Sequence, residues 1–188
     1  MRVIAGTARG RLLKVPKGML VRPTTDRVKE SVFAILMPVL RQAVVLDLFA
    51  GSGALGIEAL SRGAGRAVFV EKSTLAVSCL RENLETAGVA ALATVLNMPV
   101  ARALLLLSKH GETFDLVFMD PPYERALVGK TLDDLQKAGV VRPGAICVIE
   151  HSRREEIPAK MEKFTTFRQV RFGDTSVSFL KADLAEEQ

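Results

Sequence analysis

The chain has 188 residues, of which 48% are hydrophobic and 25% are charged, and it carries a formal net charge of +5. This length is enough for one domain with a substantial core and a small extension. No stretch approaches the roughly 20 apolar residues that span a bilayer, and the first residues lack the apolar core of a signal peptide, so we expect a soluble, cytoplasmic protein. The two cysteines and two histidines are not spaced as zinc ligands, which excludes the usual zinc sites.

The positive charge is concentrated at the N-terminus. Residues 1–41 contain nine Lys or Arg and two Asp or Glu, a net charge of +7, whereas the remaining 147 residues contain 17 basic and 19 acidic side chains. Such asymmetry is typical of proteins that bind the phosphate backbone of a nucleic acid. A solvated basic arm that only aids solubility is the alternative interpretation.

Residues 1–22 are predicted to form a small basic extension. Val3–Ala5 and Leu12–Val15 have the composition of two short strands, and Arg9 and Arg11 flank the glycine of the turn between them. Two strands alone are marginally stable, so this hairpin must lean on the rest of the chain or on a ligand.

The main domain, which we place at residues 23–188, is predicted to begin with a helix. Thr25 is a suitable N-cap, and apolar residues recur at helical spacing over residues 26–40. Arg22 and Arg27 lie on either side of the expected helix N-terminus, a place that favours anions. An N-cap with a local Arg–Asp pair explains the same residues equally well.

Strands and helices alternate through the rest of the chain. Strands are predicted at 44–48, 67–71, 93–96, 115–119 and 145–149, and helices at 54–62, 73–87, 98–108 and 126–138. The strands are apolar with little alternation, as in a parallel sheet covered on both faces. Residues 165–170 and 176–181 are expected to pair as an antiparallel hairpin. The predicted fold is α/β, a Rossmann-like, mostly parallel, doubly wound sheet with an antiparallel C-terminal hairpin and a small N-terminal β-hairpin.

The strand at 44–48 is followed by a glycine-rich turn and then by a helical pattern. Gly51-x-Gly53-x-x-Gly56 fits the dinucleotide-binding fingerprint. Gly51 and Gly53 lack the Cβ atom that would keep the backbone away from a ligand, and Gly51 can adopt a positive φ. Asp47 is unusual, because a carboxylate inside an apolar strand is unfavourable unless something polar meets it.

Asp47 distinguishes between two kinds of cofactor. Glu71 ends the second predicted strand, 20 residues after Gly51, where a carboxylate can accept hydrogen bonds from both hydroxyls of a ribose. NAD(P) enzymes and S-adenosylmethionine (SAM) methyltransferases share that arrangement. An acidic residue just before the loop repels an anionic pyrophosphate but attracts the cationic amino-acid end of SAM, so the sequence favours SAM. A surface Glu71 paired with Lys72 is the alternative interpretation of that residue.

A second motif, Asp120-Pro121-Pro122-Tyr123, follows the strand predicted at 115–119. Consecutive prolines restrict the backbone to extended conformations and keep its carbonyl groups out of helical hydrogen bonds. An exocyclic base amine is a poor nucleophile, but if the Asp120 carboxylate and the Pro121 carbonyl accept its two N–H groups, its nitrogen can face a methyl donor. Tyr123 can stack on the base, a contact worth roughly 1–3 kcal/mol. A simple strand-ending Pro-Pro turn is the alternative.

This motif resembles the Asn/Asp-Pro-Pro-Tyr/Phe motif of enzymes that methylate exocyclic amines of adenine, cytosine or guanine. More narrowly, the chain resembles almost end to end the bacterial 16S ribosomal RNA guanine-N2 methyltransferase family (RsmD-type). The matching segments are residues 6–11, 22–30, 47–56 and 120–123. The first two segments are not shared with SAM enzymes in general, which makes the resemblance specific.

The resemblance implies a class I SAM methyltransferase that methylates N2 of guanine 966 in 16S rRNA on an assembling 30S particle, and we expect a monomer. The cofactor contacts that it implies are Asp47, Phe49, Ala50, Gly51, Ser52, Gly53, Glu71, Lys72, Asn97 and Met98. The implied catalytic pocket comprises Asp120, Pro121, Pro122 and Tyr123, and the implied RNA contacts are Arg9, Arg11, Arg22 and Arg27. Asn97 departs from the Asp that is frequent at that site, although an amide can still bind the adenine amino group.

Three other functions fit parts of the sequence. A DNA adenine-N6 methyltransferase shares the Asp120 motif but usually needs a larger target-recognition region and must flip its base out of a duplex. An NAD(P)-linked oxidoreductase shares the glycine loop, but Asp47 disfavours it. An RNA-binding module without activity conflicts with the intact Asp120 motif. Glu150 and His151, after the strand predicted at 145–149, are expected to border the target side, with His151 more simply a polar strand-end residue than a general base.

Overall fold

The structure of the protein is a computed structural model that describes residues 1–16, 26–122, 127–155, 157 and 161–183. Arg22, Thr25 and Tyr123 are not in these ranges, so the predictions made for those three residues lie outside the described part of the chain. Within the described ranges, no helix is both long and apolar enough to cross a membrane.

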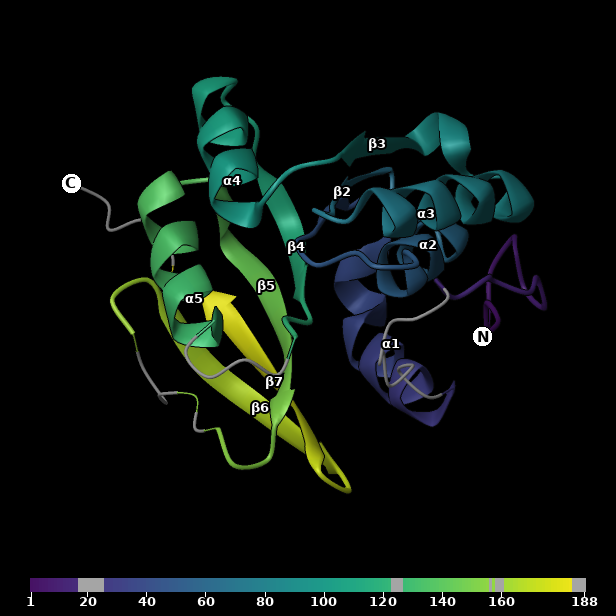
Figure 1. Cartoon of the computed structure of the whole chain (residues 1–188). Helices are drawn as coiled ribbons and strands as arrows, with labels where there is room; N and C mark the ends of the chain where they lie inside the picture. Colours follow the sequence, from purple (N-terminus) through teal and green to yellow (C-terminus); the bar gives the residue numbers. More distant parts are fainter. Residues whose placement is uncertain (17–25, 123–126, 156, 158–160, 184–188) are drawn as a thin grey trace.

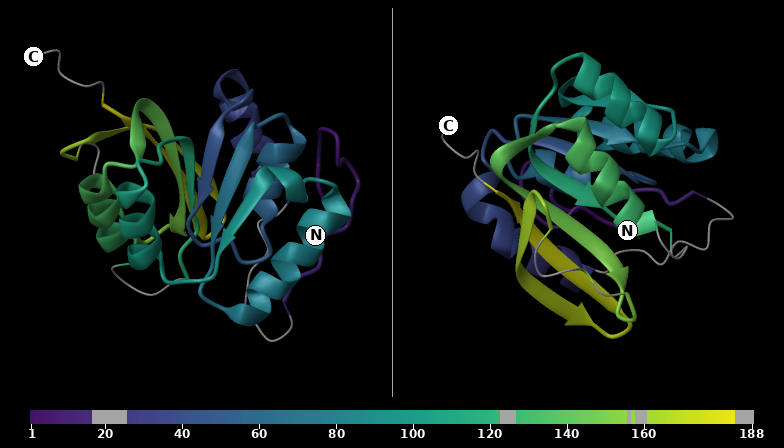
Figure 2. Two further views of the ribbon diagram at one scale, coloured as in Figure 1. Left: turned by 90° about the horizontal axis from the view of Figure 1, so that it is seen from above. Right: turned by 90° about the vertical axis from the view of Figure 1, so that its left-hand side faces the viewer.

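A seven-stranded sheet with helices on both faces forms the body of the molecule (Figures 1 and 2). The strands are β1 (Val44–Asp47), β2 (Arg66–Val70), β3 (Ala93–Leu96), β4 (Phe114–Met119), β5 (Val141–Ser152), β6 (Phe164–Phe172) and β7 (Thr175–Ala182). The helices are α1 (Asp26–Leu40), α2 (Ala54–Ser61), α3 (Thr74–Ala87), α4 (Val100–Lys109) and α5 (Leu127–Ala138), with a short 3-10 helix at Ala90–Leu92. The strand order across the sheet is β3-β2-β1-β4-β5-β7-β6.

The strands β1 to β5 are parallel and lie between two layers of helices. β1 pairs with β2 on one side and with β4 on the other, so the strand order reverses beside β1. Successive strand residues face opposite layers: Val45 packs with α1, α2 and α3, whereas Leu46 packs with α4 and α5. Because both faces are covered, the strands are apolar on both sides, and the predicted doubly wound architecture is confirmed.

The predicted C-terminal hairpin is also confirmed, with β7 lying between β5 and β6. β7 is antiparallel to both neighbours. β5 is longer than the predicted 145–149, because it already pairs with β4 at Val141 and continues to pair with β7 as far as Ser152.

The other elements predicted for residues 23–188 agree with the structure to within two residues at each described end. The largest shift is at the start of α4, which begins at Val100 rather than at residue 98. Pro99 takes the N-cap position with an extended backbone, φ −61° and ψ 147°. A residue that precedes proline is disfavoured in helical conformation, so Met98 cannot easily extend this helix.

The N-terminal extension, purple in Figure 1, lies against α2 and α3. Its two arms are joined by an isolated bridge between Arg2 and Leu12 rather than by the two short strands predicted. The backbone N–H groups of Ile4 and Ala5 donate to the Glu58 carboxylate, at 2.8 and 3.0 Å, and therefore do not pair with a neighbouring strand.

Glu58 of α2 joins three parts of the chain and has no exposed surface. It pairs with Lys29 of α1, with 3.7 Å between Nζ and Oε2, and with Arg62, with 2.7 Å between Nε and Oε1. Lys29 is equally buried and also donates to the carbonyl of Arg2. Burial lowers the pKa of Lys29, and the charge of Glu58 opposes that effect. The buried pair thus holds α1, α2 and the extension together.

Asn83 of α3 attaches the other arm of the extension. Its side-chain oxygen accepts the Lys14 N–H at 2.7 Å, and its amide nitrogen donates to the carbonyls of Lys14 at 2.9 Å and Ser52 at 2.8 Å. Asn83 is fully buried. The extension is thereby tied to the glycine-rich turn that contains Ser52.

Replacing Glu58 with Gln should destabilise the protein by about 3–5 kcal/mol, because the buried charge of Lys29 loses its buried counter-ion and keeps only the half-exposed Asp26, 4.0 Å away. Denaturant unfolding followed by circular dichroism measures the loss. The control is Glu82→Gln, which removes an exposed pair with Lys14 and should leave the unfolding midpoint nearly unchanged. Equal losses in the two variants would contradict this role for Glu58.

Candidate active site

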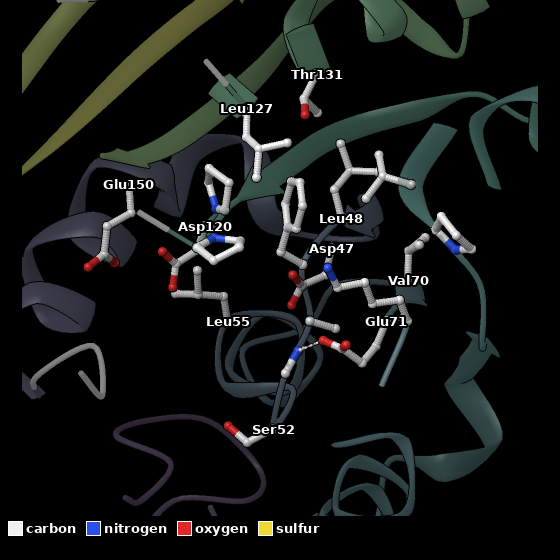
Figure 3. A pocket seen from close by; sticks show the side chains of 18 of the residues that line it. Asp47, Leu48, Ser52, Leu55, Val70, Glu71, Asp120, Leu127, Thr131 and Glu150 are labelled. Carbon is white, nitrogen blue, oxygen red and sulfur yellow. Dashed lines mark hydrogen bonds between the residues drawn. The ribbon is translucent and has the colours of Figure 1, made fainter. Parts of the chain in front are cut away.

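A cavity of about 590 Å³ opens at the carboxyl ends of the parallel strands (Figure 3). Its wall comes from segments far apart in the sequence: the turn after β1, the ends of β2, β4 and β5, the starts of α4 and α5, and the N-terminal extension. The cavity lies where the strand order reverses between β1 and β4, which is the usual ligand position in an open α/β sheet.

Most of the residues predicted for the cofactor and catalytic sites line this one cavity. They are Asp47, Phe49, Ala50, Gly51, Ser52, Glu71, Lys72, Met98, Asp120, Pro121 and Pro122. Gly53 and Asn97 do not belong to its described wall. The glycine loop and the Asp-Pro-Pro motif, 69 residues apart from Gly51 to Asp120, are thus brought together by the pairing of β1 with β4.

The three glycines of the loop lack a side chain for different reasons: one leaves room for a ligand, and two allow close packing within the protein. Gly51 and Gly53 have φ values of 52° and 83°, in the left-handed region that favours glycine. A Cβ atom on Gly51 would meet no atom closer than 4.0 Å, so a ligand can approach its backbone. A Cβ atom on Gly53 would lie 2.3 Å from Leu80 of α3, and one on Gly56 would lie 2.2 Å from Phe69 of β2. Gly51 therefore faces the cavity, whereas the other two glycines permit close packing of α2.

Asp47, at the end of β1, is only 3% exposed. Its carboxylate accepts the Gly56 N–H in the first turn of α2, at 3.1 Å. Burial raises the pKa of Asp47 to about 7; the Gly56 hydrogen bond opposes this rise, and the negative charge of Glu71 adds to it. A cation in the cavity would favour the ionised form of Asp47.

Glu71 organises the glycine loop from the end of β2. Its two carboxylate oxygens accept the N–H groups of Gly51 at 3.0 Å and Ser73 at 2.8 Å (Figure 3 shows the first). A carboxylate has about four acceptor positions, so Glu71 can accept further hydrogen bonds from a ligand in the cavity.

Asn97 supports this arrangement without lining the cavity. Its amide nitrogen donates to the carbonyls of Glu71 at 2.9 Å and Lys72 at 3.2 Å. Lys72 and Met98, on either side of that contact, do line the cavity. The structure thus places Asn97 as a support for the turn that carries Glu71.

Asp120, Pro121 and Pro122 border the cavity at the end of β4. Burial raises the pKa of Asp120 well above its usual range, and the negative charges of Glu150 and Asp47 raise it further. Pro121 is buried and Pro122 is exposed. The motif therefore presents an acidic group and an extended backbone to the same space.

Part of the cavity wall carries no sequence motif. These residues are Met1, Val15 and Pro16 from the extension, Pro99, Val100 and Ala101 around the start of α4, and Leu127, Lys130, Thr131 and Asp134 from α5. Glu150, which the sequence predicted to border the target side because it follows a predicted strand, does line the cavity, whereas His151 does not belong to its described wall. No local sequence pattern predicts that α5 and the extension line the cavity, because their positions depend on tertiary packing against distant parts of the chain.

The described wall of the cavity is acidic. It contains the carboxylates of Asp47, Glu71, Asp120, Asp134 and Glu150 against the two lysines Lys72 and Lys130. In the described part of the chain, no three His, Cys, Asp or Glu side chains are grouped as a metal site. This charge suits a cationic ligand better than an anionic pyrophosphate.

His151 lies in the sheet rather than at the cavity. It is 2% exposed, its Nδ1–H donates to the Ser152 carbonyl at 3.0 Å, and its Nε2 lies 2.8 Å from the Ser178 hydroxyl. Burial lowers the pKa of His151, so the ring is neutral near pH 7. These contacts support a structural role and not a general base.

Three of the four predicted RNA-contacting arginines lie on the outside of the molecule. Arg9 and Arg11 are exposed on the turn of the extension, and Arg27 is exposed on α1. Asp26, beside Arg27, pairs with Arg2 at 2.9 Å. Arg22, the other cation of the predicted helix-terminal anion site, lies outside the described residues.

A family described as "Conserved hypothetical protein 95" matches residues 1–181 of the chain. The chain is 38% identical over 181 residues to the Bacillus subtilis (strain 168) protein YlbH, covering 96% of this chain and 98% of that one. It is also 38% identical over 169 residues to Ribosomal RNA small subunit methyltransferase D of Escherichia coli (strain K12), covering 90% and 83% of the two chains. The chain belongs to this RsmD-type family of SAM-dependent methyltransferases. The solved structure of the Escherichia coli protein yhhF matches 97% of this chain and 98% of its own, with a TM-score of 0.85 at 35% identity.

Membership of the family confirms the resemblance found in the motifs and the class I methyltransferase fold. The cofactor is SAM, and the NAD(P)-linked alternative is excluded. The residues of the cavity fit this cofactor, because their negative charge suits a sulfonium and an ammonium group and no phosphate site is needed.

Replacing Asp47 with Asn should change how the stability of the ligand-free protein depends on pH. The pKa of this carboxyl is about 7 in the fold against an ordinary 3.8, so the folded state holds its proton more tightly, and stability is lost as the pH rises from about 4 to 7. Asn keeps an acceptor for Gly56 without the charge. It should make the protein more stable than the wild type at pH 8, by up to about 4 kcal/mol, the free-energy equivalent of that pKa difference.

Denaturant unfolding of both proteins between pH 5 and pH 8 tests this expectation. The difference in unfolding free energy should shrink steadily toward pH 5. Parallel pH profiles for the two proteins would contradict a raised pKa at Asp47.

Proposed function

We propose that the protein methylates the exocyclic N2 amine of guanine 966 in 16S rRNA, on an assembling 30S particle. The observation that carries this proposal is the single acidic cavity that Asp47 and Glu71 share with the Asp120-Pro121-Pro122 motif. The name of its Escherichia coli relative, Ribosomal RNA small subunit methyltransferase D, supports small-subunit rRNA as the substrate.

The first part of the proposal concerns the residues that bind SAM. Glu71 accepts the ribose hydroxyls through its remaining lone pairs, and the open backbone at Gly51 admits the cofactor closely. Asp47 attracts the positively charged amino-acid end. Lys72 and Met98 border the adenine. Asn97 donates to the carbonyls of Glu71 and Lys72 and so holds the backbone of these two residues in place. When bound, SAM supplies a methyl group on a cationic sulfur.

The second part concerns Asp120 and its neighbours. The Asp120 carboxylate accepts one N–H of the target amine and the Pro121 carbonyl accepts the other, which turns the nitrogen toward the methyl donor. The carboxylate must be ionised to do so, whereas burial and the negative charges of Glu150 and Asp47 raise its pKa. A cationic ligand beside it favours the ionised form, so cofactor binding prepares Asp120 for the amine. Tyr123, outside the described residues, is proposed to stack on the base.

The third part concerns RNA binding. Residues 1–22 are proposed to be the RNA-contacting extension of a methyltransferase domain at 23–188, with Arg9, Arg11, Arg22 and Arg27 as phosphate contacts. Arg9, Arg11 and Arg27 are exposed, as such contacts require. Because Glu58 and Asn83 fix the extension to α2 and α3, the backbone that carries Arg9 and Arg11 is held in place relative to the cavity. We further propose a monomeric enzyme that works in the cytoplasm.

A DNA adenine-N6 methyltransferase is the second candidate, because it would use the same Asp120 motif. The experiment that separates the two functions is incubation with labelled SAM and either unmodified small-subunit particles or duplex DNA, followed by mapping of the methylated nucleotide. Label at N2 of guanine 966 is expected. Label on duplex DNA, or at another base of the particle, would overturn the proposal.

Asp120→Asn should lower the rate of methyl transfer by about 10²–10³-fold while SAM still binds, because the amide cannot accept the amine N–H as a charged group does. Single-turnover kinetics and calorimetric SAM binding measure the two effects. Asp115→Asn, at the other end of β4 where Asp115 pairs with Arg142, is the matched control and should turn over normally. Normal turnover by Asp120→Asn would remove this residue from the mechanism.

Reversing the charge of Arg9 and Arg11 to Glu should weaken binding of small-subunit rRNA and reduce the slope of log affinity against log salt by about 1–2. Filter binding over a range of salt concentrations measures both quantities. The control reverses Lys109 and Lys137, exposed near the C-terminal ends of α4 and α5 on the side away from the cavity. If the two double variants behave alike, the extension contributes only to net charge.

A further inference from the structure

Glu150 is the acidic neighbour of Asp120 across the sheet. β4 and β5 are parallel with Met119 opposite Ile149, so Asp120 and Glu150 follow at matching positions as the two strands end. Both side chains line the cavity, and Figure 3 shows their carboxylates extending into the same part of it. The negative charge of Glu150 adds to the effect of burial in raising the pKa of Asp120.

Glu150 and His151, which are neighbours on β5, point in opposite directions. His151, the next residue, is turned into the sheet, where it contacts Ser178 of β7. Glu150 faces the other way, into the cavity, as the alternation of a strand requires. Two half-buried carboxylates that share one space repel each other, so the pair suits a ligand that offers several N–H donors at once.

Guanine offers such a set of donors. Its Watson–Crick edge carries the N1–H next to the two hydrogens of the N2 amine, three donors on neighbouring atoms. Adenine and cytosine also carry an exocyclic amine, but the ring nitrogen beside it is an acceptor with a lone pair. A carboxylate facing that ring nitrogen is paired with a donor in guanine and repelled by a lone pair in the other two bases.

We propose that Glu150 accepts the N1–H of the target base while Asp120 accepts the N2 amine, and that Glu150 thereby selects guanine over adenine and cytosine. This inference rests on the function proposed above, because it assigns the base specificity of the same site. A site that hydrogen-bonds one donor discriminates against an analogue that lacks this donor, because the hydrogen bond between base and protein is then lost.

The test compares guanine with 2-aminopurine at the target nucleotide of reconstituted small-subunit particles. 2-Aminopurine keeps the amine at C2 but has a lone pair at N1. The wild type should prefer guanine. Glu150→Gln should lower kcat/KM for guanine by about 10- to 100-fold, the value of one charge-assisted hydrogen bond, and should not lower it for 2-aminopurine, because the Gln amide can donate to N1. The ratio of the two kcat/KM values should therefore fall by at least about tenfold.

The absence of O6 from 2-aminopurine affects the wild type and the variant alike and cancels in the comparison of ratios. The matched control is Asp134→Asn, which removes one negative charge from the cavity wall on α5 and should leave the guanine preference as it is in the wild type. Unfolding midpoints of the three proteins show that each is folded under the assay conditions.

The outcomes separate the two proposals. If the wild type methylates guanine and Glu150→Gln keeps the same guanine preference, the inference about Glu150 is wrong and the proposed function stands. If the wild type methylates a base other than guanine, the proposed function fails and the assignment of Glu150 fails with it. A preference that falls equally in Asp134→Asn would also contradict the inference, since any loss of charge would then have the same effect.

Discussion

The candidate site depends on one physical constraint: acidic side chains at the ends of neighbouring parallel strands are held close together and partly or fully buried. Asp47 ends β1, Asp120 follows β4 and Glu150 lies near the end of β5, and the parallel register brings all three to one cavity. Burial and mutual repulsion raise the pKa values of Asp47 and Asp120. Neighbouring buried carboxylates are unfavourable when ionised and are stabilised by a cation, which suits a cofactor that carries a sulfonium and an ammonium group.

The N-terminal extension also contributes to the cavity and is fixed to the elements around it. The buried pair of Glu58 and Lys29 fixes its first arm, and Asn83 ties its second arm to the carbonyl of Ser52 in the glycine loop. Met1, Val15 and Pro16 of the extension line the cavity. The basic segment that we propose to contact RNA is therefore hydrogen-bonded through Asn83 to the loop that we propose to contact the cofactor.

Much of the fold could be predicted from local patterns. The apolar strands, the helical spacing and the turn glycines set the elements to within two residues at most ends, since those signals come from neighbours along the chain. Such local patterns do not predict which strands pair with one another or how far that pairing extends. The length of β5 depends on contacts with β4 and β7, and the extension lacks its predicted strands because its backbone bonds to Glu58.

The sequence by itself determined the kind of site: a glycine loop after a strand, a carboxylate that disfavours pyrophosphate, and an Asp-Pro-Pro turn suited to an amine. These are properties of residue type and short spacing, which a linear chain displays directly. Only the tertiary structure decided which residues share the cavity. It placed Glu150 beside Asp120, removed Gly53 and Asn97 from the described wall and added α5 and the extension. The reason is that distances between strand ends depend on register and packing, and neither is written in any single segment of the sequence.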